Sequence, residues 1–141
     1  MGFTLVEVLI VVAVVTIISL SAIGSYTSSL KSTRDSRRKA DLSSINKALE
    51  SYYNDNGFYP ASISAADLCA TTVNCYLKTI PTDPKGYTYY YLRGDVSGTN
   101  QSFQLYSTLE QTNDTGVGSG TYSANCGTTC RYGVSSPNTT P

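Results

Sequence analysis

The chain has 141 residues, the size of one domain or of a small domain with an appendage. Its ten Lys and Arg residues balance its ten Asp and Glu residues, so no overall charge draws it to nucleic acid or to an anionic surface. It contains no His, which excludes Ser-His-Asp and Cys-His catalysis and most zinc enzymes. No other catalytic set is visible, so we expect a protein that is not an enzyme.

An apolar run without charges extends from Val8 to Leu30. It is long enough to cross a bilayer, which requires about 20 apolar residues. Glu7 lies at its start, although placing a carboxylate in lipid costs at least ~2.5 kcal/mol. We therefore predict a transmembrane or filament-core helix over residues 3–31 and treat Glu7 as a functional candidate.

The helical pattern continues beyond this run, because apolar residues recur at steps of three and four. These residues are Leu42, Ile45, Leu49 and Tyr52. No Pro occurs before Pro60, so the sequence predicts one helix from about Phe3 to about Asp55, roughly 80 Å long at ~1.5 Å per residue. The Asp55-Asn-Gly segment provides its C-terminal stop.

The remaining sequence predicts antiparallel strands. Residues Tyr87–Arg93 and Phe103–Glu110 form a predicted hairpin, and a third strand is expected around Cys130–Val134. The polar tail Ser135–Pro141 is expected to be loose. A helix followed by such strands indicates an α+β head, residues 32–141, with one sheet face on the helix.

The four cysteines, Cys69, Cys75, Cys126 and Cys130, all follow the apolar run. An even number in a small exported domain favours disulfides. We favour the local pairs Cys69–Cys75 and Cys126–Cys130, with crossed pairing between the two regions as the alternative. Zinc is the rival interpretation, but neither spacing is C-x-x-C and no His is present.

The first stretch, GFTLVEVLIVV, closely resembles the processing and assembly motif of the type IV pilin family, which includes the pseudopilins of type II secretion. Gly2 matches the residue before the prepilin peptidase cut, Phe3 the N-methylated first mature residue, and Glu7 the acid that follows. The stretches RRKADLSSINKALESYYNDNGFYP and IPTDPKGYTYYY also resemble this family. A secretory signal would need a basic n-region, which is missing here, and an ordinary membrane anchor leaves Glu7 unexplained.

The resemblance implies a pilin fold, in which a long helix packs on a small antiparallel sheet, with residues 1–2 as a leader remnant. It implies a precursor in the cytoplasmic membrane that is cut after Gly2 by prepilin peptidase and methylated at Phe3. Inner-membrane machinery would then polymerise it into an extracellular pilus serving adhesion, twitching motility or DNA uptake. Two alternatives are a pseudopilin in a short periplasmic filament of type II secretion, and an anchored binding domain that does not polymerise.

A buried Glu7 needs a positive partner, and no Lys or Arg lies near it in the sequence. The amine created by cutting after Gly2 is one such group. In a staggered filament, the Phe3 amine of one subunit would meet Glu7 of its neighbour, and this pair would set the register. The simpler alternative is that Glu7 is protonated or reaches the membrane interface.

Two features depart from the family pattern. No Lys or Arg precedes Gly2, so we expect that the sequence starts inside a longer leader. Many pilins carry Gly where this chain has Thr16 and Pro where it has Gly24. The stretch between them contains weak helix formers, Thr16, Ser19, Ser21 and Gly24, so we expect the helix to loosen there on assembly; the alternative is an unbroken helix.

Two further clusters carry weaker hypotheses. The basic cluster Arg34, Arg37, Arg38 and Lys39 is expected to make subunit contacts or a solvated collar, with DNA or anionic headgroups as alternative partners. No cofactor is expected, although Asp95 and Asp114 in glycine-rich loops could hold calcium, as in major pseudopilins.

Overall fold

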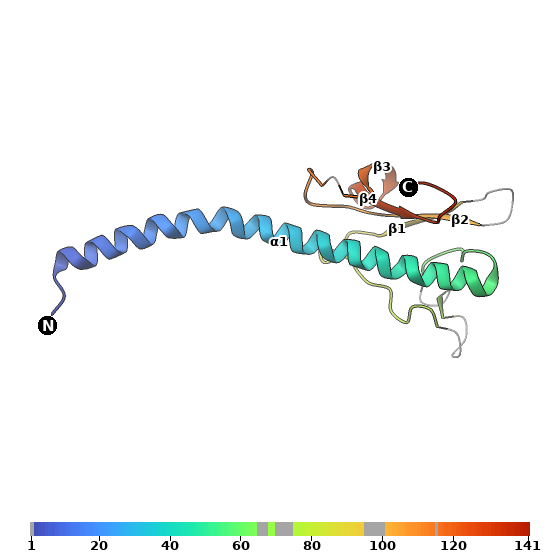
Figure 1. The fold of residues 1–141 in the computed structure, drawn as a ribbon, viewed down its shortest axis with the longest axis horizontal. Helices are drawn as coiled ribbons and strands as arrows, with labels where there is room; N and C mark the ends of the chain where they lie inside the picture. Colours follow the sequence, from blue (N-terminus) through green and yellow to red (C-terminus); the bar gives the residue numbers. More distant parts are fainter. Residues whose placement is uncertain (1, 65–67, 70–74, 95–100, 115) are drawn as a thin grey trace. The chain divides into compact units, whose positions relative to one another are not determined.

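The computed structural model describes residues 2–64, 68–69, 75–94, 101–114 and 116–141, with the backbone alone for residues 20–24. The chain divides into two compact units, Met1–Thr33 and Arg34–Pro141. Figure 1 shows the order of the elements, one long helix followed by four strands. Each unit is described by itself below.

Helix α1 spans Leu5–Asn56 and therefore belongs to both units. It begins after Thr4, whose hydroxyl oxygen accepts a hydrogen bond from the backbone N–H of Glu7 (3.3 Å), as an N-cap residue does. It ends just before Gly57, which has a φ of 77° and donates its N–H to the carbonyl of Tyr53 (2.7 Å). This left-handed residue is the usual helix C-terminal stop, as the sequence predicted.

The second unit contains one four-stranded antiparallel sheet. Its strands are β1 (Tyr90–Gly94), β2 (Ser102–Ser107), β3 (Ser119–Asn125) and β4 (Thr129–Ser135). They lie in the order β1-β2-β4-β3, so β2 and β4 are central. β1 and β2 pair antiparallel, as expected for the predicted hairpin.

The core of this unit forms between the sheet and residues 34–56 of α1. Leu42, Ile45 and Leu49 of the helix and Phe103 and Leu105 of β2 are all fully buried in one cluster. These helix positions recur every three or four residues, so they share one face. The α+β architecture predicted from the sequence, a helix packed on a small antiparallel sheet, is confirmed.

Strand β3 was not predicted, because its sequence SGTYSAN is poor in apolar and β-branched residues. Tertiary pairing with β4 creates it instead. The strand is entered through Gly118, which has a φ of 83° and whose Cβ position would lie 2.3 Å from the carbonyl oxygen of Gly133. Only glycine fits this close approach of two strands.

The C-terminal tail was predicted to be loose, and this prediction is wrong. β4 extends to Ser135, and the residues after it are tied to β2 and its entry. Gln104 donates to the carbonyl of Thr140 (2.6 Å), and Asn138 donates to the carbonyl of Gln101 (2.6 Å). The polar side chains that suggested looseness supply these hydrogen bonds.

Within the residues that the structure describes, no helix combines the length and the apolar character needed to cross a membrane. The predicted transmembrane helix is therefore not confirmed.

Candidate assembly site

The first part of α1 exposes a continuous apolar surface. Its large apolar side chains from Phe3 to Ile18 are exposed by fractions ranging from 49% for Val14 to 85% for Phe3. Single exposed apolar residues are ordinary, but a contiguous apolar surface of this extent indicates an interaction site. The segment without charges that stands out in the sequence is thus available for contacts.

Phe3 and Glu7, the two residues paired by the sequence resemblance, line one shallow cavity in this segment. Its volume is about 290 Å³, and its other walls are apolar: Val8, Val11 and Val12. Glu7 is exposed and makes no ion pair with any other described residue. Gly2, the proposed processing residue, directly precedes Phe3 and is exposed.

Glu7 also has a local role in starting the helix. Thr4 and Glu7 have the T-x-x-E spacing of a capping box, and Thr4 already accepts the Glu7 N–H. An acid in the first turn is favoured by the helix dipole as well. An experiment on Glu7 must therefore separate its charge from its capping role.

The stretch expected to loosen lies in unbroken α1 in the isolated chain. Thr16 donates its hydroxyl to the carbonyl of Ala13 and Ser19 to that of Val15, both at 2.8 Å. Such bonds compete with the helix ladder and tend to bend helices. The side chain of Ser21 lies outside the described residues, as does the surrounding of Gly24. Loosening on assembly stays a prediction.

In the second unit, Arg34 and Arg38 of the basic cluster are paired inward, whereas Arg37 is exposed. Arg38 is fully buried and pairs with Asp83 (2.5 Å), Asp35 (2.7 Å) and Glu110 (3.0 Å). Arg34 pairs with Glu110 through two hydrogen bonds, at 2.6 and 2.7 Å. The predicted collar is therefore wrong for these two residues, because carboxylates far away in the sequence draw them inward.

Three cations and three carboxylates balance in this cluster, since Lys85 also contacts Glu110 at 3.0 Å. Asp35 ties the backbone as well, by accepting from the N–H groups of Glu110 (2.9 Å) and Gln111 (2.9 Å). Hydrogen bonds from Arg34, and then from Lys85 and Arg38, outweigh burial and lower the pKa of Glu110 well below its usual range. The cluster fixes the chain after β2 against α1.

Asp83 shows the same balance. Burial alone would raise the pKa of its carboxyl, but hydrogen bonds from Arg38 and from the backbone N–H of Lys85 lower it. Asp83 belongs to the PTDPKG segment, which the sequence identified only as a turn. The charges of opposite sign in the two segments were visible in the sequence, but their pairing was not.

Asp114, one of the two acids expected to bind calcium, pairs with a lysine of the chain. Lys39 pairs with Asp114 at 2.5 Å, and Ser119 and the N–H of Gly116 donate to the other carboxylate oxygen. The hydrogen bond from Lys39 is the main reason why the pKa of Asp114 is lowered to about 2. Asp95 lies outside the described residues, and no metal-binding group of three acids or cysteines occurs among the described ones.

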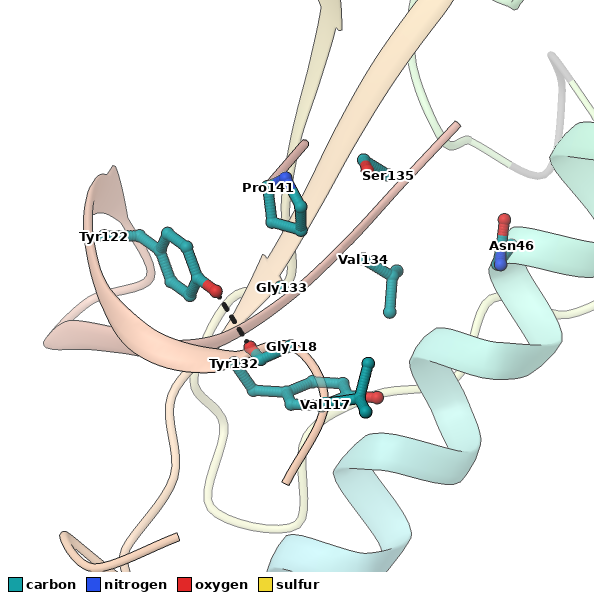
Figure 2. A pocket seen from close by; sticks show the side chains of 9 residues that line it. All are labelled: Asn46, Val117, Gly118, Tyr122, Tyr132, Gly133, Val134, Ser135 and Pro141. Carbon is teal, nitrogen blue, oxygen red and sulfur yellow. Dashed lines mark hydrogen bonds between the residues drawn. The ribbon is translucent and has the colours of Figure 1, made fainter. Parts of the chain in front are cut away.

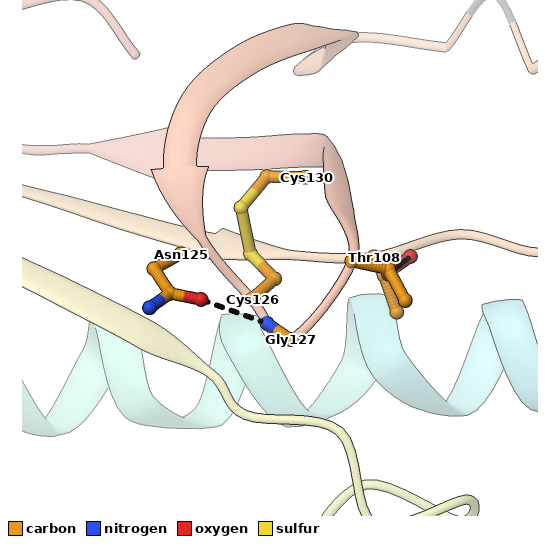
Figure 3. The surroundings of a disulfide bond; sticks show 6 residues. Thr108, Asn125, Cys126, Gly127 and Cys130 are labelled. Atoms are coloured by element: carbon orange, nitrogen blue, oxygen red, sulfur yellow. Dashed lines mark hydrogen bonds between the residues drawn. A yellow bond between two sulfur atoms is a disulfide. The ribbon is translucent and has the colours of Figure 1, made fainter.

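The structure contains two disulfides, Cys69–Cys75 and Cys126–Cys130, which are the local pairs favoured by the sequence. Both sulfur atoms of the second are fully buried under β3 and β4, in a cluster with Tyr106. Figure 3 shows this disulfide closing the β3–β4 turn, where Asn125 accepts the N–H of Gly127 (3.3 Å). All four cysteines are bonded, so none is available as a metal ligand.

A cavity of about 460 Å³ lies beside β4 (Figure 2). Asn46 of α1, Val134 of β4 and the exposed Val117 are among its lining residues, and the Oδ1 atom of Asn46 is buried without a hydrogen-bond partner among the described residues. Its walls carry no charged side chain. No local sequence pattern predicts this cavity, because residues from distant parts of the chain line it.

A helix with an exposed apolar first part and a small antiparallel sheet on its second part defines a pilin-like protein. Comparison with known families agrees: residues 25–123 match the family "Type II secretion system (T2SS), protein G", and the chain belongs to this family.

Individual relatives support this assignment. The chain is 30% identical to the type II secretion system core protein G of Pseudomonas aeruginosa, over 75% of this chain and 80% of that protein. It is 27% identical to the core protein G of Vibrio cholerae, over 74% and 78%. The fimbrial protein EcpC of Eikenella corrodens is 29% identical over 60% of this chain and 56% of its own length. No solved structure matches significantly.

Proposed function

We propose that the protein is a pseudopilin, the structural subunit of a short periplasmic filament of a type II secretion system. The observation that carries the proposal is the match to the protein G family across most of the second unit, including the helix residues that hold the sheet. The sequence alone favoured an extracellular type IV pilus and kept the pseudopilin as the alternative. The similarity to the two core G proteins reverses this order.

In this proposal, prepilin peptidase cuts after Gly2, Phe3 is methylated, and the apolar segment holds the subunit in the cytoplasmic membrane until assembly. The run without charges from Val8 to Leu30 supports the membrane step. The exposed apolar side chains from Phe3 to Ile18 then become the filament core, since packing them against other copies keeps them out of water once the subunit leaves the membrane. The role is structural and requires neither catalysis nor a cofactor.

The geometry around Glu7 supports its role in docking. Its carboxylate lies in a cavity with Phe3 and three valines, without a cation of its own among the described residues. An incoming subunit whose new N-terminal amine enters this cavity would neutralise Glu7, and a displaced subunit would leave both charges unpaired in an apolar site. Leaving one partner of a buried pair unmatched costs roughly 3–5 kcal/mol, enough to select the register.

Three variants separate charge from capping. Glu7→Gln removes the charge and keeps a residue that is suited to the capping box. Thr4→Ala removes the N-cap hydroxyl and keeps the charge, and Val14→Ala trims an exposed apolar side chain outside the cavity. We expect Glu7→Gln to abolish filament formation and export when the variants are expressed with their secretion genes, while the other two still assemble.

Normal filaments from Glu7→Gln together with failed assembly of Thr4→Ala would show that Glu7 acts only through the helix start, and would overturn the docking role. The secretion role itself is tested by deleting the gene. We expect loss of exported proteins from the medium with surface pili unchanged.

The second candidate is a type IV pilus subunit, which the similarity to the fimbrial protein EcpC favours. Loss of long surface filaments from the deletion strain, with export intact, would establish this candidate in place of the pseudopilin.

A further inference from the structure

Arg131 of β4 faces a groove in the second unit. It is half-buried, and its side chain makes no ion pair or hydrogen bond with any other residue that the structure describes. Two adjoining cavities, of about 150 and 280 Å³, both include Arg131, Leu109 and Thr112 in their walls. The guanidinium therefore stands in the middle of one continuous groove.

The other charged walls of this groove are already neutralised. Asp114 lines the smaller cavity, but its carboxylate pairs with Lys39. Glu110 lines the larger one, but Arg34, Arg38 and Lys85 surround its carboxylate. Among the described residues that line the groove, the charge without a partner is therefore the positive one of Arg131.

Hydroxyl groups provide further donors beside this charge. Thr129 lies two positions before Arg131 on β4 and lines the larger cavity, and Thr121 of β3 lines the smaller one. Neither hydroxyl has a hydrogen-bond partner among the described residues. A guanidinium flanked by free hydroxyls suits a carboxylate, which accepts two parallel N–H bonds from an arginine and further bonds from O–H donors.

The groove is open to solvent, since Thr121 and Thr129 in its walls are both exposed. Sites for free small molecules bury most of the ligand surface, which this open groove does not do. A side chain delivered by a larger partner needs less enclosure, because the rest of the partner stays outside. We propose that the Arg131 groove binds an aspartate or glutamate side chain of a partner protein.

The Arg131 groove belongs to the unassembled subunit and is separate from polymerisation through Glu7. An acid from a partner also fits the other charges of the unit, since Glu110 and Asp114, the acids in the groove walls, are held by cations of the chain itself. Neither of these two acids is therefore left to pair with Arg131.

The test is a titration of the full chain in detergent, followed by NMR of backbone amides and arginine side chains. The probes are N-acetyl-glutamate methylamide, which carries one side-chain carboxylate, its neutral glutamine analogue, and acetate. We expect saturable shifts at Arg131, Thr121 and Thr129 with the glutamate probe, none with the glutamine probe, and binding by acetate at least about tenfold weaker.

Arg131→Ala and the longer neutral Arg131→Gln should each weaken binding of the glutamate probe by at least about tenfold, since a charge-assisted pair is lost. Arg93→Ala is the matched control, because Arg93 is also a half-buried strand arginine but lines neither cavity. Equal binding of acetate and the glutamate probe would overturn the proposal that the groove binds a side chain of a partner protein. No shifts at these residues, or binding unchanged in both Arg131 variants, would overturn the site.

Discussion

The guanidinium of Arg38 holds the carboxylate of Asp83 through two hydrogen bonds, Nε to Oδ2 at 2.5 Å and Nη2 to Oδ1 at 3.2 Å, across 45 positions of sequence. Both side chains are completely buried. This pair joins α1 to the turn that precedes β1, so the helix and the sheet are connected by charge as well as by the apolar core.

Replacing Asp83 by Asn should destabilise the second unit by about 1.5–3 kcal/mol, because Arg38 loses its charge-assisted bonds to Asp83 while Asp35 and Glu110 still pair with it. Lys85→Ala should change the free energy of unfolding by less than about 1 kcal/mol, since the lysine side chain is 46% exposed in its pair with Glu110. The free energy of unfolding of both variants can be measured in urea, with the near-UV circular dichroism of the tyrosines as the signal. Similar values for the two variants would contradict the importance of the buried pair.

The stability of this unit should fall in acid. The pKa values of Asp83, Glu110 and Asp114 are all lower in the folded protein than in the unfolded chain. A lowered carboxyl pKa stabilises the fold above the unfolded value of about 4, and this stabilisation is lost as the pH falls through the folded value. For Asp114 the loss runs from about pH 4 to about pH 2.

The measurement is the urea midpoint as a function of pH between neutrality and pH 2. Lys39→Met should raise the pKa of Asp114, because the hydrogen bond from Lys39 is the main cause of the shift. The urea midpoint of this variant should then fall less between about pH 4 and pH 2 than that of the unchanged protein. A midpoint that stays constant down to pH 2 would contradict the assignment.

The two disulfides should differ in their response to reductant. Cys75 is exposed, whereas Cys126 and Cys130 are fully buried. Mild dithiothreitol should therefore reduce Cys69–Cys75 in the folded protein and leave Cys126–Cys130 intact until the unit unfolds, as alkylation and mass spectrometry would show. Replacing Cys126 and Cys130 together by Ala should cost about 2 kcal/mol or more, from lost loop closure and packing. Simultaneous reduction of both bonds under native conditions would argue against this difference.

Helix α1 should loosen between Thr16 and Gly24 when the subunit enters a filament. The backbone N–H groups of this stretch should then exchange faster with deuterium in the filament than in the isolated subunit, relative to the N–H groups of residues 42–49. Substituting Ser19 and Gly24 by Ala raises helix propensity and should slow this exchange. Equal protection of residues 16–24 in both states would favour the unbroken helix.

Much of this architecture could be predicted from local patterns. The periodicity of Leu42, Ile45 and Leu49 indicated which helix face is buried, and Gly57 marked the helix end, because both depend on residues close together in the sequence. Strand β3 and the ordered tail could not be predicted in this way, since their stability comes from partners in β2 and β4 and not from their own composition.

The sequence by itself determined the helix, the apolar segment with Glu7 at its start, the α+β class and the resemblance to pilins, since these follow from residue order and local chemistry. Only the tertiary structure decided which charges are available. Arg34 and Arg38 looked like a basic surface, yet both are paired inward. Arg131, which no pattern distinguished, lines a groove and has no ion-pair partner in the described part of the chain. The reason is physical: a charge becomes neutralised or available through neighbours that the fold brings from distant parts of the chain.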